Sequence, residues 1–353
     1  MRILITGVAG FVGTALAQQF KLSLSGIDIL GIDNFSRPGS EINRSTLKKM
    51  GVELRHGDIR CSSDLALLPG VDWVIDAAAL PSVTAGIDTP GASRQLMEVN
   101  LIGTINLLEY CRRHSAGFVL ISTNRVYNIT SLADLPLNSG QTRFELNTSA
   151  GLPDGTSSKG LSESFSTASP NSLYGTSKLC AENLAREYGL AFDMPVWINR
   201  CGILAGAGQF GRPDQGILAY WLHSWLYKKP LKYIGFGGGG HQVRDCLHPQ
   251  DLAQLLCKQL HKSPALENIF NIGGGQENTF SLMELSGWCT DRWGPHSVES
   301  VPDTRQFDVP WLAMDSRLAS SQFDWSPQTS LTDILSDIGQ HAEGNPDWLE
   351  KTI

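Results

Sequence analysis

A tyrosine and a lysine stand four residues apart in the segment YGTSK, as Tyr174 and Lys178. Residues at this spacing share one face of a helix, so the lysine ammonium would lie beside the tyrosine phenol. A free tyrosine titrates near pH ~10, and a neighbouring cation favours the phenolate and so lowers that pKa. Such a phenol can remove a proton from a hydroxyl group while a hydride leaves the same carbon. The pair alone is a weak signal, because tyrosine and lysine at this spacing are common on surface helices.

Two hydroxyl side chains, Ser122 and Thr123, follow the apolar run at residues 117–121. The run is typical of a parallel strand, and ligands bind at the carboxyl ends of such strands. We therefore expect Thr123 to hydrogen-bond the oxygen that reacts. Thr123, Tyr174 and Lys178 form the predicted catalytic set.

The N-terminal segment carries the pattern of a dinucleotide-binding unit. A short apolar run ends at Gly7, glycines follow at Gly10 and Gly13, and a second apolar run ends at Asp33. In such units the glycines permit a tight turn, a close approach of backbone N–H groups to a pyrophosphate, and close packing of the following helix. Asp33 would accept hydrogen bonds from the adenosine ribose. With strands on both sides and the acid in register, the pattern predicts a dinucleotide site.

The acid at the end of the second run also bears on which dinucleotide binds. The Asp33 carboxylate would repel the 2′-phosphate of NADP, which favours NAD. Arg37 is the opposing signal, because an arginine near this acid can accommodate that phosphate. The sequence therefore predicts NAD, with NADP left open by Arg37.

Composition narrows the class of protein. A chain of 353 residues is long enough for one large domain or two closely joined ones. The net charge of −7 argues against a nucleic-acid partner. No apolar run is long enough to span a membrane, and the N-terminus does not resemble a signal peptide. The seven scattered cysteines and eight unclustered histidines favour free thiols in the cytoplasm and no metal site.

Apolar runs alternate with helical patterns in the first two hundred residues, which is typical of an α/β fold with a doubly wound, Rossmann-type parallel sheet. Beyond residue 200 the alternation becomes irregular. We expect an NAD-binding domain over residues 1–199 with a returning segment near 242–262, and a smaller, less regular domain for the substrate over most of 200–353. The apolar runs lie near residues 2–6, 28–32, 52–55, 72–76, 117–121 and 195–199.

Two helices and one long connection can be placed within this pattern. Residues 91–113 are apolar nearly all round, so a buried helix is expected there, and residues 173–188 carry a narrower apolar stripe. Residues 128–172 are polar, with little periodicity. An unstructured connection of that length inside a compact domain is usually functional, often as a lid.

Several short segments together resemble the extended short-chain dehydrogenase/reductases, and within them the nucleotide-sugar epimerases. The segments STNRVY, GQFGRPDQG (208–216) and GHQVRD (240–245) are similar to the branch of CDP-tyvelose (CDP-paratose) 2-epimerases. Those enzymes hold NAD tightly, oxidise one sugar carbon to a ketone, let the intermediate reorient, and return the hydride to the opposite face. The residues that carry the wider resemblance are Thr6-Gly-x-x-Gly-x-x-Gly13, Asp33-Asn34, Gly57-Asp58-Ile59, Ala77-Ala78-Ala79, Asn100-x-x-Gly-Thr104, Ser122-Thr123 with Val126-Tyr127, and Tyr174-x-x-x-Lys178.

The resemblance implies a set of binding residues. Arg244 would pair with the substrate diphosphate, for which an arginine fork is suited, with Arg305 as a second cation; the plain alternative is a surface ion pair between Arg244 and Asp245. The implied cofactor residues are Gly7, Gly10, Phe11, Val12, Gly13, Asp33, Asn34, Asp58, Ile59, Ala77, Ala79, Asn100, Ser122, Tyr174 and Lys178. The implied substrate residues are Ser82, Thr123, Asn124, Gln209, Asp214, Gln215, Arg244 and Arg305.

Three departures from the family pattern limit the substrate assignment. Asn128 stands where many members have glycine, and Arg200-Cys201-Gly202 lacks the asparagine with which many 4-epimerases contact the diphosphate. Asn124-Arg125 replaces the Asp-Glu pair with which the 4,6-dehydratases eliminate water, so dehydration is not expected.

The sequence thus predicts an NAD-dependent nucleotide-sugar epimerase, with C2 of a CDP-sugar favoured. Two rivals remain open: a 4-epimerase or decarboxylase of a UDP-sugar or uronic acid sugar, and a non-catalytic sensor of NAD(H). The complete Thr-Tyr-Lys set argues against the sensor. The expected partners are a nucleotide-diphosphate sugar and a second copy of the chain, paired through helices 91–113 and 173–188, with no nucleic acid and no membrane.

Overall fold

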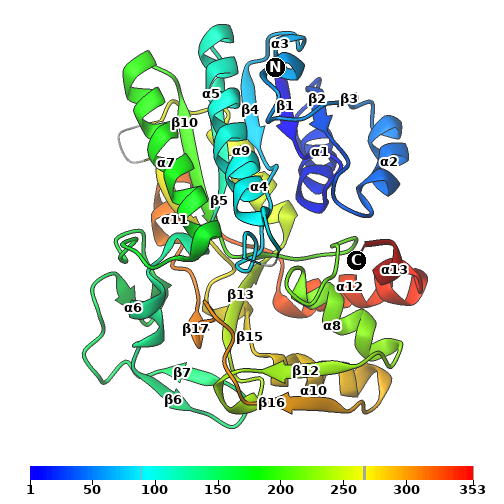
Figure 1. The fold of residues 1–353 in the computed structure, drawn as a ribbon, viewed down its shortest axis with the longest axis vertical. Coiled ribbons are helices and arrows are strands. Elements are labelled where there is room, and N and C mark those ends of the chain that lie inside the picture. Colours follow the sequence, from blue (N-terminus) through cyan, green and yellow to red (C-terminus); the bar gives the residue numbers. More distant parts are fainter. Residues whose placement is uncertain (88, 265–267, 353) are drawn as a thin grey trace.

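Seven parallel strands form the central sheet of the computed structural model, which describes residues 1–87, 89–264 and 268–352 (Figure 1). The strand order is β14-β10-β5-β4-β1-β2-β3, so the chain winds outward from β1 in both directions. This confirms the predicted doubly wound α/β fold. The strands are β1 (Arg2–Thr6), β2 (Asp28–Asp33), β3 (Glu53–His56), β4 (Trp73–Asp76), β5 (Gly117–Thr123), β10 (Val196–Cys201) and β14 (Ile269–Ile272).

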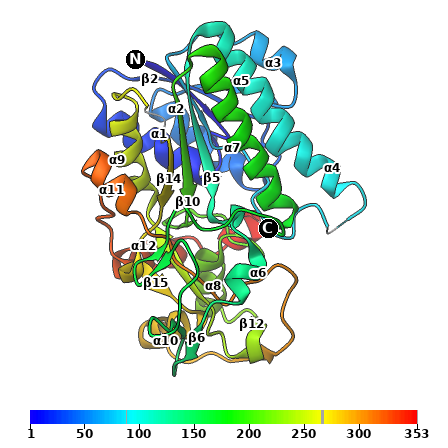
Figure 2. The ribbon, with the colours of Figure 1, turned by 90° about the vertical axis from the view of Figure 1, so that its left-hand side faces the viewer.

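Helices cover both faces of this sheet, as Figure 2 shows. Successive side chains of a strand point to opposite faces, so Ile3 and Ile5 enter one apolar cluster and Leu4 enters the other. The first face is covered by α1 (Phe11–Ser23), α9 (Pro249–Gln259) and α11 (Arg317–Phe323). The second is covered by α5 (Gly103–His114) and α7 (Ser172–Phe192), with α3 (Ser62–Ala66) at its edge.

Both predicted helices are present. The helix expected over residues 91–113 consists of α4 (Ala92–Met97), one π-helical turn, η2 (Glu98–Ile102), and α5, which follow one another directly. The helix expected over 173–188 is α7. In the part of the chain that the structure describes, no helix combines the length and apolarity needed to cross a membrane.

A smaller lobe lies below the carboxyl ends of the sheet strands (Figure 1). It holds a mixed sheet of β11 (Ile203–Leu204), β13 (Val243–Leu247), β15 (Thr279–Phe280) and β17 (Trp311–Leu312), and a parallel pair of β12 (Leu231–Ile234) with β16 (Val298–Val301). Its helices are α8 (Ile217–Leu226), α10 (Leu282–Trp293), α12 (Leu331–Gly344) and α13 (Trp348–Thr352). The chain crosses between the lobes repeatedly, because α9, β14 and α11 all return to the large sheet.

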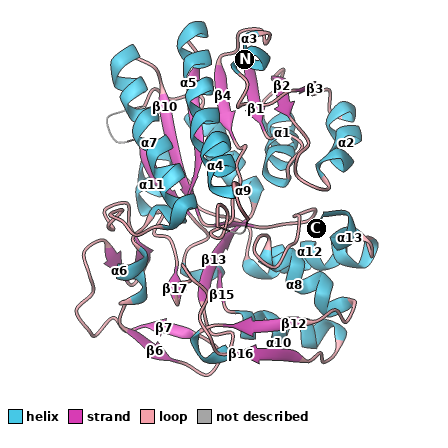
Figure 3. Ribbon diagram, viewed as in Figure 1, coloured by secondary structure: helices cyan, strands magenta, loops and turns pink. Residues whose placement is uncertain are grey.

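The polar segment 128–172 is not the unstructured connection that its composition predicted. It holds α6 (Ile129–Ala133), the hairpin β6 (Leu137–Ser139)–β7 (Phe144–Leu146), and the hairpin β8 (Thr156–Ser157)–β9 (Gly160–Leu161), as Figure 3 shows. These strands are too short to give a periodic signal. The segment is held by apolar side chains such as Leu161 and Phe165, which cluster with Trp311 of the smaller lobe.

Candidate functional site

The glycine turn after β1 has the geometry that a dinucleotide needs. Gly7 adopts a left-handed backbone (φ 59°), and a Cβ on Gly13 would lie 2.3 Å from the Gly7 carbonyl oxygen, so larger residues do not fit there. Helix α1 begins directly after Gly10, which offers no side-chain cap to the first turn. The backbone N–H groups of Phe11 and Val12 are thus available to an anion at this helix end. The predicted glycine residues fit a bound pyrophosphate.

Asp33 lies at the end of β2, beside this turn. Its Oδ2 accepts a hydrogen bond from the Ala9 N–H at 2.9 Å, and its Oδ1 accepts one from the Phe35 N–H at 2.8 Å. Burial raises the pKa of this carboxyl, and the two N–H donors partly offset that effect. The turn and the acid are thus fixed relative to each other, which suits recognition of the adenosine ribose.

The two polar residues predicted to bind the adenosine half contact each other. The Asn34 Nδ2 donates to Asp58 Oδ2 at 2.9 Å. A hydrogen bond from Arg60 is the main cause that lowers the pKa of Asp58 to about 2, so this carboxyl is ionised at neutral pH. Ile59 packs on helix α5, where a Cβ on Gly103 would lie 2.5 Å from its Cδ1 atom.

Arg37, which could accommodate the 2′-phosphate of NADP, extends toward the smaller lobe. Its guanidinium lies 6.0 Å from the centre of the Phe210 ring, and the charges of Arg212 and Asp214 act on it. Burial is the main cause that lowers the pKa of Arg37 to about 10. This cation thus lies at the junction of the two lobes.

The loop after β4, which holds the predicted residues Ala77 and Ala79, is fixed by buried hydroxyl groups. The Thr6 hydroxyl donates to Asp76 Oδ1 at 2.9 Å and accepts from the Ala77 N–H at 3.1 Å. Asp76 also accepts from the Thr104 hydroxyl at 2.9 Å. This buried carboxylate at the end of the strand was not among the predicted site residues.

Asn100 connects that loop to the helix that carries the tyrosine. From the π-helical turn, its Oδ1 accepts from the Leu80 N–H at 2.9 Å and its Nδ2 donates to Ser177 Oγ at 3.1 Å. π-Helical turns are frequent at functional sites. Ser82, farther along the loop, is also buried, and its hydroxyl lies 3.0 Å from that of Thr84.

The structure brings Thr123 and Tyr174 together at the carboxyl edge of the sheet. Tyr174 lies in the first turn of α7 and is 7% exposed. Burial is the main cause that raises the pKa of Tyr174 to about 12, and a hydrogen bond with the Thr123 hydroxyl and the charge of Arg125 act in the opposite direction. The cation acting on the phenol is thus Arg125, which was not among the predicted catalytic residues.

Lys178 is fully buried one turn farther along α7. Burial lowers its pKa, and the carboxylates of Asp76 and Glu182 act against that effect. Its ammonium is therefore balanced by acids on two elements, β4 and α7. A lysine held in this way can bind the hydroxyl groups of a nicotinamide ribose, and this role remains a prediction.

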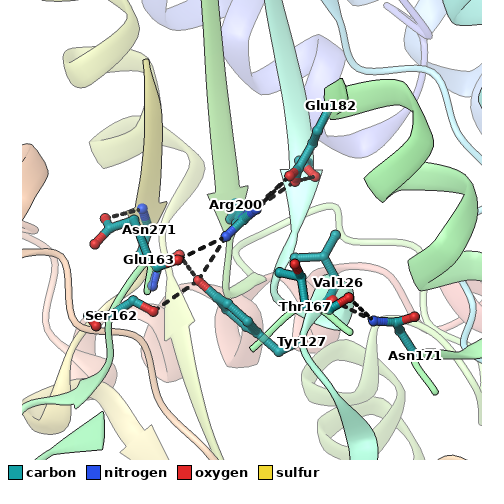
Figure 4. Close-up of polar contacts among 10 residues, drawn as sticks. Val126, Tyr127, Ser162, Glu163, Thr167, Asn171, Glu182, Arg200 and Asn271 are labelled. Carbon is teal, nitrogen blue, oxygen red and sulfur yellow. Dashed lines mark hydrogen bonds and ion pairs between the residues drawn. The ribbon is translucent and has the colours of Figure 1, made fainter. Parts of the chain in front are cut away.

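Figure 4 shows a polar network around Arg200, which includes Glu182, Tyr127 and Asn271. The Ser122 hydroxyl donates to Glu182 Oε1 at 2.5 Å, and Glu182 pairs with Arg200 at 2.7 Å. Arg200 also donates to the Tyr127 hydroxyl at 3.3 Å, which in turn donates to Asn271 Oδ1 at 2.6 Å. The network joins α7, β10 and β14 to the segment between β5 and α6.

Arg244, which was predicted to bind the substrate diphosphate, forms an ion pair with Asp308 and not with its neighbour Asp245. Its Nη2 lies 2.7 Å from Asp308 Oδ1, whereas Asp245 is fully buried. Adjacent residues of a strand point to opposite faces, so the expectation of a surface ion pair between Arg244 and Asp245 is wrong. Arg305 is exposed in the loop that also supplies Asp308.

The loop before α8 holds the remaining predicted substrate residues. Gln209 is buried, and its side chain is bound within the lobe by Leu204 O at 2.6 Å and the Ala219 N–H at 3.2 Å. Asp214 lies 3.5 Å from the Arg212 Nε, and the Gln215 N–H donates to the Arg212 carbonyl at 3.2 Å. Trp348 of α13 donates to the Gln209 carbonyl at 2.9 Å.

The predicted residues thus fall into four groups: those expected to bind the cofactor, the pair Thr123 and Tyr174 with Asn124 buried beside it, the loop before α8, and Arg244 with Arg305 in the smaller lobe. Arg125 stood in the segment STNRVY, so its position was visible in the sequence. The acids Asp76, Glu182 and Asp308 gave no local signal, because their partners lie far away in the chain. Across the described ranges of the chain, no group of three His, Cys, Asp or Glu residues could hold a metal ion.

Comparison with known proteins identifies the family of this chain. Residues 3–273 match the NAD dependent epimerase/dehydratase family. A CDP-paratose 2-epimerase from Salmonella typhi is 33% identical over 94% of this chain and 96% of its own length. The uncharacterized UDP-glucose epimerase YtcB from Bacillus subtilis (strain 168) is 29% identical over 95% of this chain and 96% of its own.

A solved structure extends the likeness to three dimensions. UDP-glucuronic acid 4-epimerase from Bacillus cereus, in complex with UDP-glucuronic acid and NAD, has a TM-score of 0.78 and 25% identity. The match covers 98% of this chain and 99% of that one. The glycine turn and Asp33 fit the dinucleotide that the family uses. This chain is therefore an NAD-dependent member of the epimerase/dehydratase family, within the extended short-chain dehydrogenase/reductases.

Proposed function

We propose that this chain is a nucleotide-sugar epimerase that inverts one ring carbon through a transient ketone, with C2 of a CDP-sugar as the favoured substrate position. The observation that carries the proposal is the pairing of Tyr174 with the Thr123 hydroxyl, next to Asn124 and Arg125. A base and an orienting hydroxyl suffice for oxidation and reduction at one carbon. The 33% identity to a CDP-paratose 2-epimerase supports the choice of substrate.

Bound NAD supplies the acceptor for the hydride that leaves the sugar carbon. Thr123 orients the reacting hydroxyl group, and Tyr174 accepts its proton as the carbon–hydrogen bond breaks. Tyr174 then holds that proton near the ketone oxygen and returns it after the sugar has presented its other face. Lys178 and Asp33 would hold the two ribose groups of the cofactor, and the first turn of α1 its pyrophosphate.

A second candidate is 4-epimerisation or decarboxylation of a UDP-linked uronic acid sugar. The fold match to UDP-glucuronic acid 4-epimerase, with a TM-score of 0.78, is the observation that favours this candidate. A non-catalytic sensor of NAD(H) has no need of a hydroxyl, a phenol and an ammonium at one site. A sensor would turn over no sugar nucleotide.

The test is incubation of the purified protein with CDP-, UDP-, GDP- and dTDP-sugars, followed by NMR for new stereoisomers. The proposal expects one new epimer, a transient rise in NADH absorbance and no net consumption of cofactor. A new C4 epimer of a UDP-sugar would select the second candidate. Stoichiometric consumption of cofactor, or no reaction with any sugar nucleotide, would overturn the epimerase assignment.

The chain is also proposed to form a homodimer through α4–α5 and α7. These helices lie side by side on one face of the molecule (Figure 2), and the Tyr188 hydroxyl of α7 donates to Glu109 of α5 at 2.7 Å. Apolar side chains on this face reach solvent, among them Ile102, which is 43% exposed. Pairing with a second copy would cover them.

A further inference from the structure

We propose that Arg125 is a further catalytic residue, whose guanidinium binds an oxyanion of the substrate directly beside the hydroxyl group that reacts. The inference rests on the proposed function and assigns this anion site to a residue of the sheet lobe. The oxyanion is a diphosphate oxygen or a sugar carboxylate, and the experiment below distinguishes the two.

The position of Arg125 is fixed by the elements around the base. It lies in the 3-10 turn η3 (Asn124–Val126), and its N–H donates to the Thr123 hydroxyl at 3.1 Å. Helix α7 packs directly on this turn, because a Cβ on Gly175 would lie 2.1 Å from the Arg125 carbonyl oxygen. Asn171, which precedes α7, donates to the Val126 carbonyl at 2.8 Å (Figure 4). The backbone of Arg125 is therefore held against the turn that carries Tyr174.

The guanidinium of Arg125 lacks a partner of its own. Within the described part of the chain its Nη1 is buried and makes no hydrogen bond. A buried charged donor without a partner is unfavourable, so native structures rarely leave one unless a ligand or water completes its hydrogen bonds. The unpartnered nitrogen points to a group that arrives with the substrate.

The charges around Arg125 indicate what that group is. The groups that act on it are Arg244 of β13, Asp308 of the loop before β17, and Tyr174 of α7. Asp308 is already engaged, because it pairs with Arg244 at 2.7 Å, and Arg244 also donates to the Val309 carbonyl at 2.7 Å. Arg244 interacts with Asp308 and also with the buried Asp245, whereas Asp308, already paired with Arg244, is the carboxylate that acts on Arg125. The positive charge of Arg125 beside the phenol is therefore not fully compensated. An oxyanion is the ligand that complements this charge.

The location of the site bears on which carbon reacts. Arg125 interacts electrostatically with both Tyr174 and Arg244. In a nucleotide sugar the diphosphate is attached to C1, so C2 is the neighbouring carbon and C4 lies across the ring. A diphosphate oxygen held by Arg125 would therefore bring the hydroxyl group on C2, rather than that on C4, to Tyr174.

Arg125 also contributes a charge to the base. Tyr174 faces Thr123 of β5, Arg125 of η3 and Cys201 of β10, with Lys178 one turn along its own helix. Among the described groups that act on Tyr174, Arg125 is the cation that favours the phenolate. Removal of this charge would raise the pKa of Tyr174 further, and the reaction would then need a higher pH.

The experiment compares Arg125→Gln and Arg125→Lys with the control Arg292→Gln, which removes an exposed arginine paired with Glu343 in the smaller lobe. Titration calorimetry with CDP and with UDP measures the anion site without turnover. We expect Arg125→Gln to weaken binding of both nucleotides by about 10-fold or more, as for loss of a hydrogen bond to a charged group. We expect Arg292→Gln to bind as the unchanged protein does.

The kinetic arm uses the sugar nucleotide that turns over. Arg125→Gln should lower kcat and move the acidic limb of its pH profile, where the rate rises as the phenol ionises, upward by about 1 pH unit, the size of shift that one adjacent cation produces. Arg125→Lys should restore the limb while leaving nucleotide binding weak, because lysine keeps the charge but not the fork. Retained NAD and an unchanged unfolding temperature would show that each variant is folded.

The outcomes separate the possible results. Weakened CDP and UDP binding assigns the oxyanion to the diphosphate. Unchanged nucleotide binding with weakened binding of a UDP-linked uronic acid assigns it to a carboxylate, which supports the site but shifts the substrate. Unchanged binding of all three overturns the proposal. If the unchanged protein turns over no sugar nucleotide, the proposed function fails, and the calorimetric arm still decides whether Arg125 binds an anion.

Discussion

At the scale of single residues, the phenol of Tyr174 lies in surroundings that oppose its own ionisation. Burial raises its pKa to about 12, and the Thr123 hydroxyl and the Arg125 charge only partly reverse this effect. The positive nicotinamide ring of bound NAD would act in the same direction as Arg125. We therefore expect Tyr174 to act as a base only when the cofactor is in place.

Tyr174→Phe removes the oxygen that accepts the proton and little else. We expect kcat to fall by about 10²–10⁴-fold, the usual contribution of a general base, while binding of the sugar nucleotide is retained. Steady-state kinetics and calorimetry on the same preparation measure the two quantities. Activity largely intact in this variant would show that another group is the base.

Asp33→Ala removes the carboxylate from the end of β2. Loss of a charged acceptor for ribose hydroxyl groups should weaken NAD by roughly 10–100-fold. The sugar nucleotide binds elsewhere, so its dissociation constant should change less. Equal loss of both ligands would instead indicate that the glycine turn, which Asp33 holds through the Ala9 N–H, has unfolded.

At the scale of elements, the strands and helices that were predicted are those with a long and regular apolar pattern. Alternating apolar runs sufficed for six strands of the large sheet and for the helices at 91–113 and 173–188. The hairpins of residues 128–172 were missed because their strands are only two or three residues long. Their apolar side chains pack on residues of the smaller lobe that are distant in the sequence. Strand β14 was also missed, because apolar runs and helical patterns no longer alternate regularly in the part of the chain that precedes it.

The polar contacts between elements were the least predictable part of the site. Glu182 and Arg200 are 18 residues apart in the chain, yet α7 and β10 bring them into a buried ion pair. Arg200 stands opposite Ser122 in the β10–β5 register, which places the pair directly behind Thr123. Neither a spacing nor a motif indicates such a contact, because it depends on how the helix lies on the sheet.

Arg200→Gln tests the importance of this pair. The change leaves Glu182 buried without its cation, so we expect the free energy of unfolding to fall by about 3–5 kcal/mol. Arg292→Gln breaks the exposed pair with Glu343 and should cost about 1 kcal/mol or less. Urea unfolding followed by circular dichroism compares the two. Similar losses for both would mean that the buried network contributes little.

At the scale of the whole molecule, the sheet lobe and the smaller lobe are joined by more than one crossing of the chain. Arg37 lies over Phe210, and Trp348 of the C-terminal helix bonds the Gln209 carbonyl. The loop after β2 is approached by the same helix, since a Cβ on Gly39 would lie 2.8 Å from Thr352 Cγ2. The C-terminal helix thus contacts both the loop after β2 and the loop that holds the predicted substrate residues.

The proposed homodimer is a prediction at this scale. The mass measured by light scattering at micromolar concentration should be twice that of the 38.4 kDa chain. Ile102→Glu places a charge on the exposed face of the paired helices and should shift that mass toward the monomer. Leu22→Glu, at a position 74% exposed on α1, which covers the opposite face of the sheet, is the matched control and should leave the mass unchanged. If the unchanged protein has the mass of a monomer, the proposed homodimer is wrong.

Completion of the large sheet late in the chain has a consequence for how the protein is synthesised. Strand β10 pairs on its outer side with β14, and α1 is covered by α9, which lies downstream of residue 248. A nascent chain that has emerged only to residue 199 would expose the unpaired edge of β10 and the apolar side chains of α1 to solvent. Both features favour aggregation. We therefore expect the large sheet and its glycine turn to become stable only after α9 and β14 have been synthesised, so a fragment that ends at residue 199 should not fold as an autonomous unit.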